Sequence, residues 1–222
     1  MRPRIVLLHA TPVAIEPILA AFRESWPEAE VVNLLDDGLT LDRAKEETLS
    51  RRLIDRFVAL GKYASEMDAS GILITCSAFG PAIDELAAAV SIPVLKPNEA
   101  MFEAALKQGK RIGMLATFGP SVPTMTEEFE QYAHAVGSNA TLETVLVPDA
   151  IDLLRKGDSE THNRLVAAQA HELAQCDAIM LAHFSTSRAA EQVRDTVTNT
   201  ILTAPHAAVE KMKTLVTGAQ KC

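Results

Sequence analysis

The same order of apolar and helical segments occurs twice in this chain, and this repetition restricts its fold more than any other feature. The apolar segment 4–10 runs into a proline-containing turn and a helical pattern, and the segment 110–116 does the same. A second apolar run at 71–75 ends at a cysteine, and its counterpart at 177–182 ends at a histidine. Short apolar runs that alternate with helical periodicity predict parallel strands covered by helices on both faces. The fold class is therefore predicted to be α/β.

The pattern assigns four strands and their connecting helices to each half of the chain. Strands are predicted at 4–10, 30–35, 71–75, 92–95, 110–116, 141–147, 177–182 and 200–203. Helices are predicted up to about 26, at about 42–67 and 81–90, from about 124, in two patterns up to 175, and from about 188. The similar halves predict two pseudo-symmetric lobes, each a parallel sheet flanked by helices, with an active-site cleft between them.

Composition excludes several classes of protein. Hydrophobic residues make up 48% and charged residues 23% of the 222 residues, as in a soluble globular protein. No apolar run reaches membrane-spanning length and the first residues do not have the pattern of a signal peptide, so we expect a cytoplasmic protein. The net charge of −8 without a basic cluster argues against nucleic acid or a membrane surface as partner. The sequence leaves the oligomeric state open, a homo-oligomer included.

Three cysteines, at positions 76, 176 and 222, are too few and too widely spaced for a disulfide framework or a zinc site, so we expect no metal. The run 71–75 stops at Cys76, and Pro81 suits the first turn of a following helix. The positive end of that helix predicts a site that favours the thiolate. The alternative is that Cys76 is a small buried hydrophobic residue at a strand end.

His183 follows a strand as Cys76 does, and Thr11 and Thr117 follow two further strands. Ligands of open α/β sheets bind outside the carboxyl ends of the strands, which favours all four residues as site residues. His183 alone fits a core histidine with one backbone partner, but its correspondence to Cys76 favours function. A cysteine and a histidine can both exchange protons near neutral pH once their surroundings shift them, which suits acid-base chemistry at a carbon beside a carboxylate.

Hydroxyls and backbone N–H groups near these strand ends are candidates to bind a small anionic substrate at helix starts, although about half of them are expected to be helix caps only. These candidate substrate-binding residues are Thr11, Ser77, Ala78, Thr117, Ser121 and Ser185. Thr11 in particular is predicted to be an N-cap, whatever its further role. The remaining polar groups are predicted to be peripheral: His9 as support, His206 at a cleft rim, the Asp36–Asp37 pair as a solvated turn, and Cys176 and Cys222 as structural or incidental.

Several short motifs together resemble the aspartate/glutamate/hydantoin racemase superfamily, whose relatives include arylmalonate decarboxylase and maleate isomerase. The motifs are Thr75-Cys-Ser77, Ile92-Pro-Val-Leu-Lys-Pro-Asn98, Leu115-Ala-Thr117, Leu181-Ala-His183 and Ile201-Leu-Thr-Ala-Pro205. The resemblance implies two lobes related by pseudo-twofold symmetry, with the C-terminal helix returning to the first. We therefore expect a first lobe of residues 1–98 plus 206–222 and a second lobe of residues 99–205.

The resemblance also implies cofactor-independent chemistry, with Cys76 and His183 as catalytic residues. Racemases of the superfamily carry one catalytic cysteine per lobe, and His183 stands at the second position here. Arylmalonate decarboxylase keeps only the second-lobe cysteine, whereas this chain keeps only the first. We expect an isomerase or racemase of a small carboxylate or amino acid derivative. The alternatives are a malonate-type decarboxylase, a non-catalytic protein that binds small dicarboxylates, and a hydrolase in which His183 activates Cys76.

Overall fold

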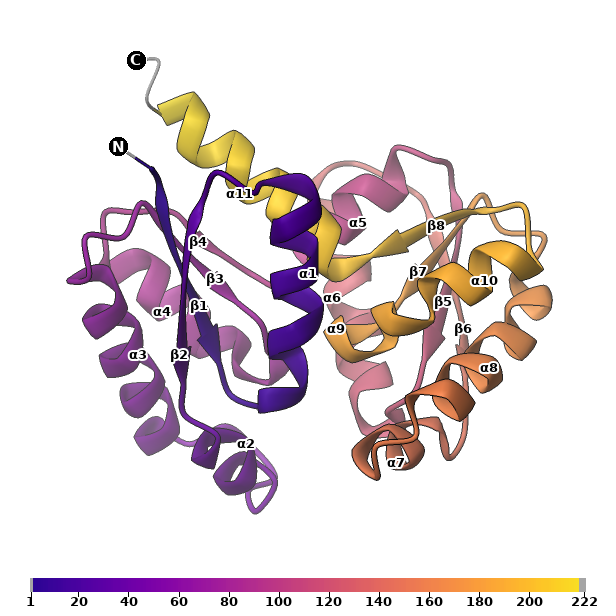
Figure 1. Cartoon of the computed structure of the whole chain (residues 1–222), viewed down its shortest axis with the longest axis horizontal. Coiled ribbons are helices and arrows are strands. Elements are labelled where there is room, and N and C mark those ends of the chain that lie inside the picture. Colours follow the sequence, from indigo (N-terminus) through magenta and orange to yellow (C-terminus); the bar gives the residue numbers. More distant parts are fainter. Residues whose placement is uncertain (1, 220–222) are drawn as a thin grey trace. The chain divides into compact units, whose positions relative to one another are not determined.

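The computed structural model describes residues 2–219, and the chain divides into two compact units (Figure 1). The first unit consists of Met1–Pro97 with Ala208–Cys222, and the second of Asn98–Ala207. Each unit contains one four-stranded sheet, and every pair of neighbouring strands in both sheets is parallel. The predicted α/β class with two similar parallel sheets is therefore confirmed.

The first unit has the strand order β2-β1-β3-β4. Its strands are β1 (Arg4–His9), β2 (Glu30–Leu35), β3 (Gly71–Ile74) and β4 (Val94–Leu95). Its helices are α1 (Ile15–Ser25), α2 (Gly38–Arg43), α3 (Arg51–Ser65) and α4 (Gly80–Ala89), with short 3₁₀ helices at Pro12–Ala14 and Ser77–Phe79. Central strands β1 and β3 read as continuous apolar runs because both faces of a parallel sheet are covered by helices.

The second unit repeats this arrangement with the order β6-β5-β7-β8. Its strands are β5 (Arg111–Ala116), β6 (Thr141–Leu146), β7 (Ala178–Leu181) and β8 (Thr200–Thr203). Its helices are α5 (Glu99–Leu106), α6 (Val122–Ala135), α7 (Ala150–Arg155), α8 (Ser159–Gln169), α9 (His183–Thr186) and α10 (Ala190–Thr196), with 3₁₀ helices at Gly119–Ser121, Ala170–Leu173 and Ser187–Ala189. Helix α11 (Ala204–Ala219) begins in this unit and continues in the first.

Each unit has its own core of aromatic and aliphatic side chains. In the first unit Phe57 of α3 stacks on Phe79 with ring centroids 5.1 Å apart, and both side chains are fully buried. In the second unit Phe102 of α5 meets Phe129 of α6 edge to face at 5.5 Å. Aromatic pairs in these geometries add roughly 0.5–1.5 kcal/mol to the stabilisation that comes from area burial.

The sequence-based prediction failed at two helices. The single helix predicted at about 42–67 is wrong, because α2 ends at Arg43 and α3 begins only at Arg51. Ser50 caps α3, accepting a hydrogen bond from the Leu53 N–H, while its own N–H donates to Glu46. These two bonds fix a break in the helical pattern. Helix α5 was not predicted.

Candidate functional site

Cys76 connects β3 to the short helix Ser77–Phe79 in the first unit. Its backbone is extended, with φ −135° and ψ 122°, and Pro81 lies in the first turn of α4 as predicted. Burial raises the pKa of the Cys76 thiol, and a hydrogen bond from the Ala78 N–H to the sulfur lowers it by less. The prediction that this position favours the thiolate is therefore wrong, because desolvation outweighs the donor at the helix start.

A buried hydrogen-bond network lies directly before Cys76. His9 at the end of β1 is fully buried, and its Nδ1 lies 2.8 Å from the Thr75 hydroxyl and its Nε2 3.0 Å from Asn33 Oδ1. An amide oxygen only accepts, so Nε2 carries the proton and Nδ1 accepts from Thr75. Burial lowers the pKa of His9, which keeps the ring neutral. The network joins the end of β1, the interior of β2 and the residue after β3, and it fixes Thr75, the residue before Cys76.

His183 connects β7 to α9 in the second unit with an unusual backbone. Its φ is 66°, in the left-handed region that a residue with a side chain seldom adopts. The side chain is half-buried, and its Nε2 lies 2.6 Å from Ser121 Oγ at the start of α6. The desolvation caused by the surrounding protein lowers the pKa of His183 to about 4. The imidazole is therefore neutral at neutral pH.

Cys76 and His183 occupy equivalent register positions in the two sheets. Leu8 of β1 pairs with Ile74 of β3, and Cys76 stands two residues after Ile74. In the second unit Leu115 of β5 pairs with Leu181 of β7, and His183 stands two residues after Leu181. Both residues thus follow the carboxyl end of the same strand of their sheet, the edge at which α/β proteins bind ligands.

The other candidate residues fall into two groups. Thr117 is buried with its hydroxyl 3.2 Å from Thr186, and Ser121 contacts His183, so the second unit brings two pairs together. Thr11 holds the N-cap position of the helix Pro12–Ala14, as predicted, although its side chain makes no capping hydrogen bond.

Ser77 and Ala78 belong to the short helix after Cys76, where Ala78 is exposed, and Ser185 is buried in α9. Sequence reasoning missed Asn33 and Thr186 as partners. Neither residue belongs to a motif, and their contacts join segments far apart in the chain.

The peripheral groups differ in part from expectation. Asp36 is not a solvated turn residue, because its carboxylate accepts two hydrogen bonds from Arg56 at 2.6 and 2.7 Å. Cys176 is buried, and burial raises its pKa. The hydroxyl of Thr203 lies 2.9 Å from His206 Nδ1. Cys222 lies outside the described residues.

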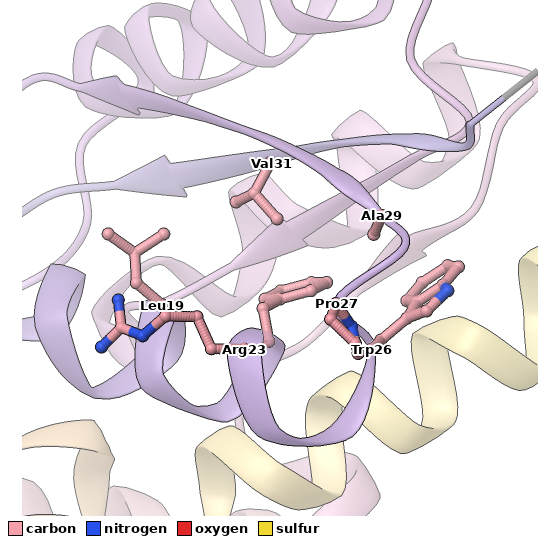
Figure 2. Close-up of a pocket in the computed structure, with 7 residues that line it drawn as sticks. Leu19, Arg23, Trp26, Pro27, Ala29 and Val31 are labelled. Atoms are coloured by element: carbon pink, nitrogen blue, oxygen red, sulfur yellow. The ribbon is translucent and has the colours of Figure 1, made fainter.

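An open pocket of about 210 Å³ lies elsewhere in the first unit (Figure 2). It is lined by Leu19, Phe22, Arg23, Trp26, Pro27, Ala29 and Val31. Ala29 and Val31 stand at the amino end of β2, whereas Cys76 follows the carboxyl end of β3. The pocket therefore holds none of the candidate groups. Within residues 2–219, no cluster of His, Cys, Asp and Glu side chains has the geometry of a metal site.

The chain is an α/β protein of two units, each with a four-stranded parallel sheet, and polar side chains follow the equivalent strands β3 and β7. The family described as Asp/Glu/Hydantoin racemase matches residues 14–136, more than half of the chain. The chain therefore belongs to this family. A comparison with curated proteins found no match. No helix within the described residues is long and apolar enough to cross a membrane.

Solved structures of similar fold cover nearly the whole chain at low sequence identity. A glutamate racemase from Bacillus anthracis matches with a TM-score of 0.72 and 14% identity, over 98% of this chain and 82% of that protein. Allantoin racemase from Klebsiella pneumoniae matches with a TM-score of 0.73 and 18% identity, over 98% and 89%. A mutant of arylmalonate decarboxylase matches with a TM-score of 0.71 and 15% identity, over 97% and 94%. At these identities the likeness establishes the fold.

Proposed function

We propose that this protein is a cofactor-independent isomerase or racemase of a small carboxylate or amino acid derivative, with Cys76 and His183 as its acid-base pair. The observation that carries the proposal is the equivalent register position of these two residues in a member of a racemase family. The solved relatives include racemases of glutamate and of allantoin. The proposal requires both side chains to act on one substrate carbon.

The shifted pKa values assign a role to each group in the resting protein. The imidazole of His183, with its pKa at about 4, is an unprotonated base at neutral pH. Cys76, whose pKa burial raises, is a protonated acid. An acid and a base that are both ready at the working pH are what proton abstraction beside a carboxylate needs.

The reaction proceeds through two proton transfers. His183 takes the proton from the carbon beside the carboxylate, and the electron pair of the broken C–H bond moves into the carboxylate to form an enediolate. The S–H proton of Cys76 is then delivered to the opposite face of the carbon, which leaves a thiolate and an imidazolium. Exchange with water restores the starting protonation. Thr11, Ser77 and Ser185 are the candidate donors that stabilise the developing negative charge.

A panel of amino acids, hydantoins, malonates and maleate in deuterated water tests the proposal. A substrate of the wild-type protein should show inversion or isomerisation together with deuterium uptake at the reacting carbon. Cys76→Ser and His183→Asn should each abolish inversion while keeping substrate affinity within about threefold, because serine and asparagine keep the shape but lose the acid or base. Exchange of the α-proton of one enantiomer should survive in Cys76→Ser, where the unprotonated His183 remains as base, and should be lost in His183→Asn, where only the protonated Cys76 thiol remains.

Matched variants separate chemistry from folding. Cys176→Ser changes a buried cysteine, and His134→Asn changes an exposed histidine on α6; both should keep wild-type rates. No turnover and no deuterium uptake across the panel would count against the isomerase. Full activity of His183→Asn would show that His183 is a packing residue.

Decarboxylation of a malonate is the second candidate, because the two equivalent positions carry only one thiol. Loss of carbon dioxide generates the enediolate without a base, so one proton donor on one face completes the reaction. In that case His183→Asn should retain turnover of malonates, whereas Cys76→Ser should lose it. Release of carbon dioxide by the wild-type protein distinguishes this reaction from isomerisation.

A further inference from the structure

Ser121 makes an unusual set of contacts for a residue that begins a helix. It holds the N-cap position of α6, where a serine side chain commonly accepts a hydrogen bond from the helix. Here the side chain makes no such bond. Its Oγ lies 2.7 Å from the Phe118 carbonyl oxygen and 2.6 Å from His183 Nε2. The Ser121 hydroxyl is therefore hydrogen-bonded to the His183 ring and not to a backbone N–H of α6.

The single proton of the Ser121 hydroxyl decides the direction of these bonds. The Phe118 carbonyl oxygen only accepts, so Ser121 must be the donor of that bond. Ser121 Oγ then accepts from His183, and the proton of the imidazole resides on Nε2. Within residues 2–219 the bond to Ser121 is the hydrogen bond that the His183 ring makes, so Nδ1 carries the free lone pair.

The backbone conformation of His183 is a second, independent observation that indicates a functional position. A residue other than glycine in the left-handed region costs of order 1 kcal/mol or more, and such residues gather at functional sites. The Ala182 N–H donates to the Leu115 carbonyl at 2.9 Å, which anchors the chain just before the strained residue. The bond to Leu115 holds the backbone before His183, and the bond to Ser121 holds its ring.

We infer that Ser121 is a positioning residue that fixes His183 as the Nε2–H tautomer and thereby presents Nδ1 as the base. The inference rests on the proposed function for the role of the base, but the tautomer itself is a property of the substrate-free protein. When Nδ1 gains a proton, the Nε2–H continues to donate to Ser121, so no hydrogen bond is lost during the transfer. A base held in this way needs little rearrangement at the moment of reaction.

Histidine labelled with ¹⁵N reports the tautomer directly by NMR. The wild-type protein at pH 7 should show His183 as a neutral ring with the Nε2–H tautomer, identified by the signals that vanish in His183→Asn. Ser121→Ala should convert this signature into a mixture with the Nδ1–H tautomer. Ser121→Thr keeps the hydroxyl and should keep the wild-type signature.

Ser187 offers a matched control inside the same unit. Its hydroxyl donates to the Phe184 carbonyl three residues earlier, as Ser121 donates to Phe118, but within the described residues the ring of His183 bonds to Ser121 and not to Ser187. Ser187→Ala should leave the tautomer and the activity unchanged. Toward a substrate found by the panel, Ser121→Ala should lower kcat about tenfold with KM within about twofold, and Ser121→Thr should restore kcat.

The two proposals fail in different ways. An Nδ1–H tautomer in the wild-type protein, or an unchanged tautomer in Ser121→Ala, overturns the positioning role whether or not the protein is an isomerase. A wild-type Nε2–H tautomer that Ser121→Ala alters upholds the role even if no substrate on the panel reacts. If Ser121→Ala does not fold, the wild-type tautomer and Ser121→Thr still decide the question.

Discussion

At the scale of single residues, desolvation sets the protonation of the two proposed reacting groups in opposite directions. It raises the pKa of the Cys76 thiol and lowers that of the His183 imidazole to about 4. Burial disfavours whichever form carries charge, so both groups are neutral at pH 7. A neutral thiol is an acid and a neutral imidazole is a base. Burial at both positions therefore gives Cys76 the role of acid and His183 the role of base, because the charged form of a thiol is the deprotonated one and that of an imidazole is the protonated one.

The pH dependence of the reaction should reflect these shifts. The dependence of kcat/KM on pH reports groups of the free enzyme, so activity should fall on the acid side only as His183 is protonated, near pH 4. On the alkaline side it should fall above about pH 8.5, the ordinary thiol value, because burial raises the pKa of Cys76. A pH–rate profile from 3.5 to 10.5 tests both limbs. An acid limb near the ordinary histidine value of about 6.5 would contradict a desolvated base.

The free energy of unfolding should also depend on pH through His183. Its pKa is lower in the folded protein than in the unfolded chain, where it is about 6.5, so the unfolded state binds more protons between these values. The stabilisation is complete above pH 6.5 and is lost as pH falls toward 4. Urea unfolding of wild type and His183→Asn between pH 4.5 and 7.5 measures this effect, and the variant should have the flatter profile. Identical slopes would show that His183 titrates alike in both states.

The network around His9 should contribute to stability through its hydrogen bonds. Thr75→Val keeps the shape of the side chain but leaves the buried Nδ1 of His9 without a donor, which should cost about 1–3 kcal/mol in urea unfolding. The exposed Thr214, whose hydroxyl donates to the Glu210 carbonyl, is the control, and Thr214→Val should change stability by less than about 0.5 kcal/mol. An unchanged midpoint for Thr75→Val would mean that the bond is not made.

How far the sequence predicts the candidate site depends on the distance over which each contact acts. Cys76 and His183 could be found because each closes an apolar run, and the two runs correspond. The contact between Ser121 and His183 spans 62 residues and arises only when β5 and β7 pair. The desolvation that keeps Cys76 protonated is a tertiary effect as well. A helix start beside a cysteine therefore indicated a thiolate, and burial reversed that expectation.

At the scale of elements, the strands were easier to predict than the helices. All eight strands lie within two residues of their predicted ends, because buried parallel strands read as continuous apolar runs. The missed break between α2 and α3 has a local signal in Ser50, a capping residue, but the apolar spacing continues across it. Periodicity alone cannot separate one helix from two helices whose buried faces are in phase.

The packing of α3 against α4 depends on one glycine. A methyl group at Gly61 of α3 would overlap the buried side chain of Leu86 of α4. Gly61→Ala should therefore destabilise the protein by about 1–3 kcal/mol in urea unfolding, although alanine is the better helix former. Gly80→Ala is the control, because no atom lies within 4 Å of a methyl group there. Adding Leu86→Val to Gly61→Ala should cost less than the sum of the single changes, and strict additivity would place the strain elsewhere.

At the scale of the whole molecule, the chain makes one unit from a single segment and the other from two. The second unit is the continuous segment Asn98–Ala207, whereas the first unit needs Ala208–Cys222 in addition to Met1–Pro97. Within the first unit, Met212 of α11 is buried beside Gly71 at the start of β3, and Lys213 Nζ donates to the Ser25 carbonyl at 3.0 Å. Helix α11 thus packs on a sheet whose four strands all lie within residues 4–95, more than a hundred residues before it in the sequence.

A chain that ends at Ala207 should reveal whether the two units unfold separately. Trp26, the single tryptophan, belongs to the first unit and follows Ser25, the residue that Lys213 contacts, so its fluorescence reports on that unit. Removal of Met212 alone should cost about 2–5 kcal/mol by the cavity it leaves, and the truncation should therefore move the Trp26 transition to lower urea. The NMR signature of His183, which depends on second-unit contacts, should be lost at the same urea concentration as in the full chain. Met212→Ala should reproduce the shift of the first transition in part. If the Trp26 and His183 signals shift together, the two units unfold in one cooperative transition, and the two-unit division then holds for the structure but not for unfolding.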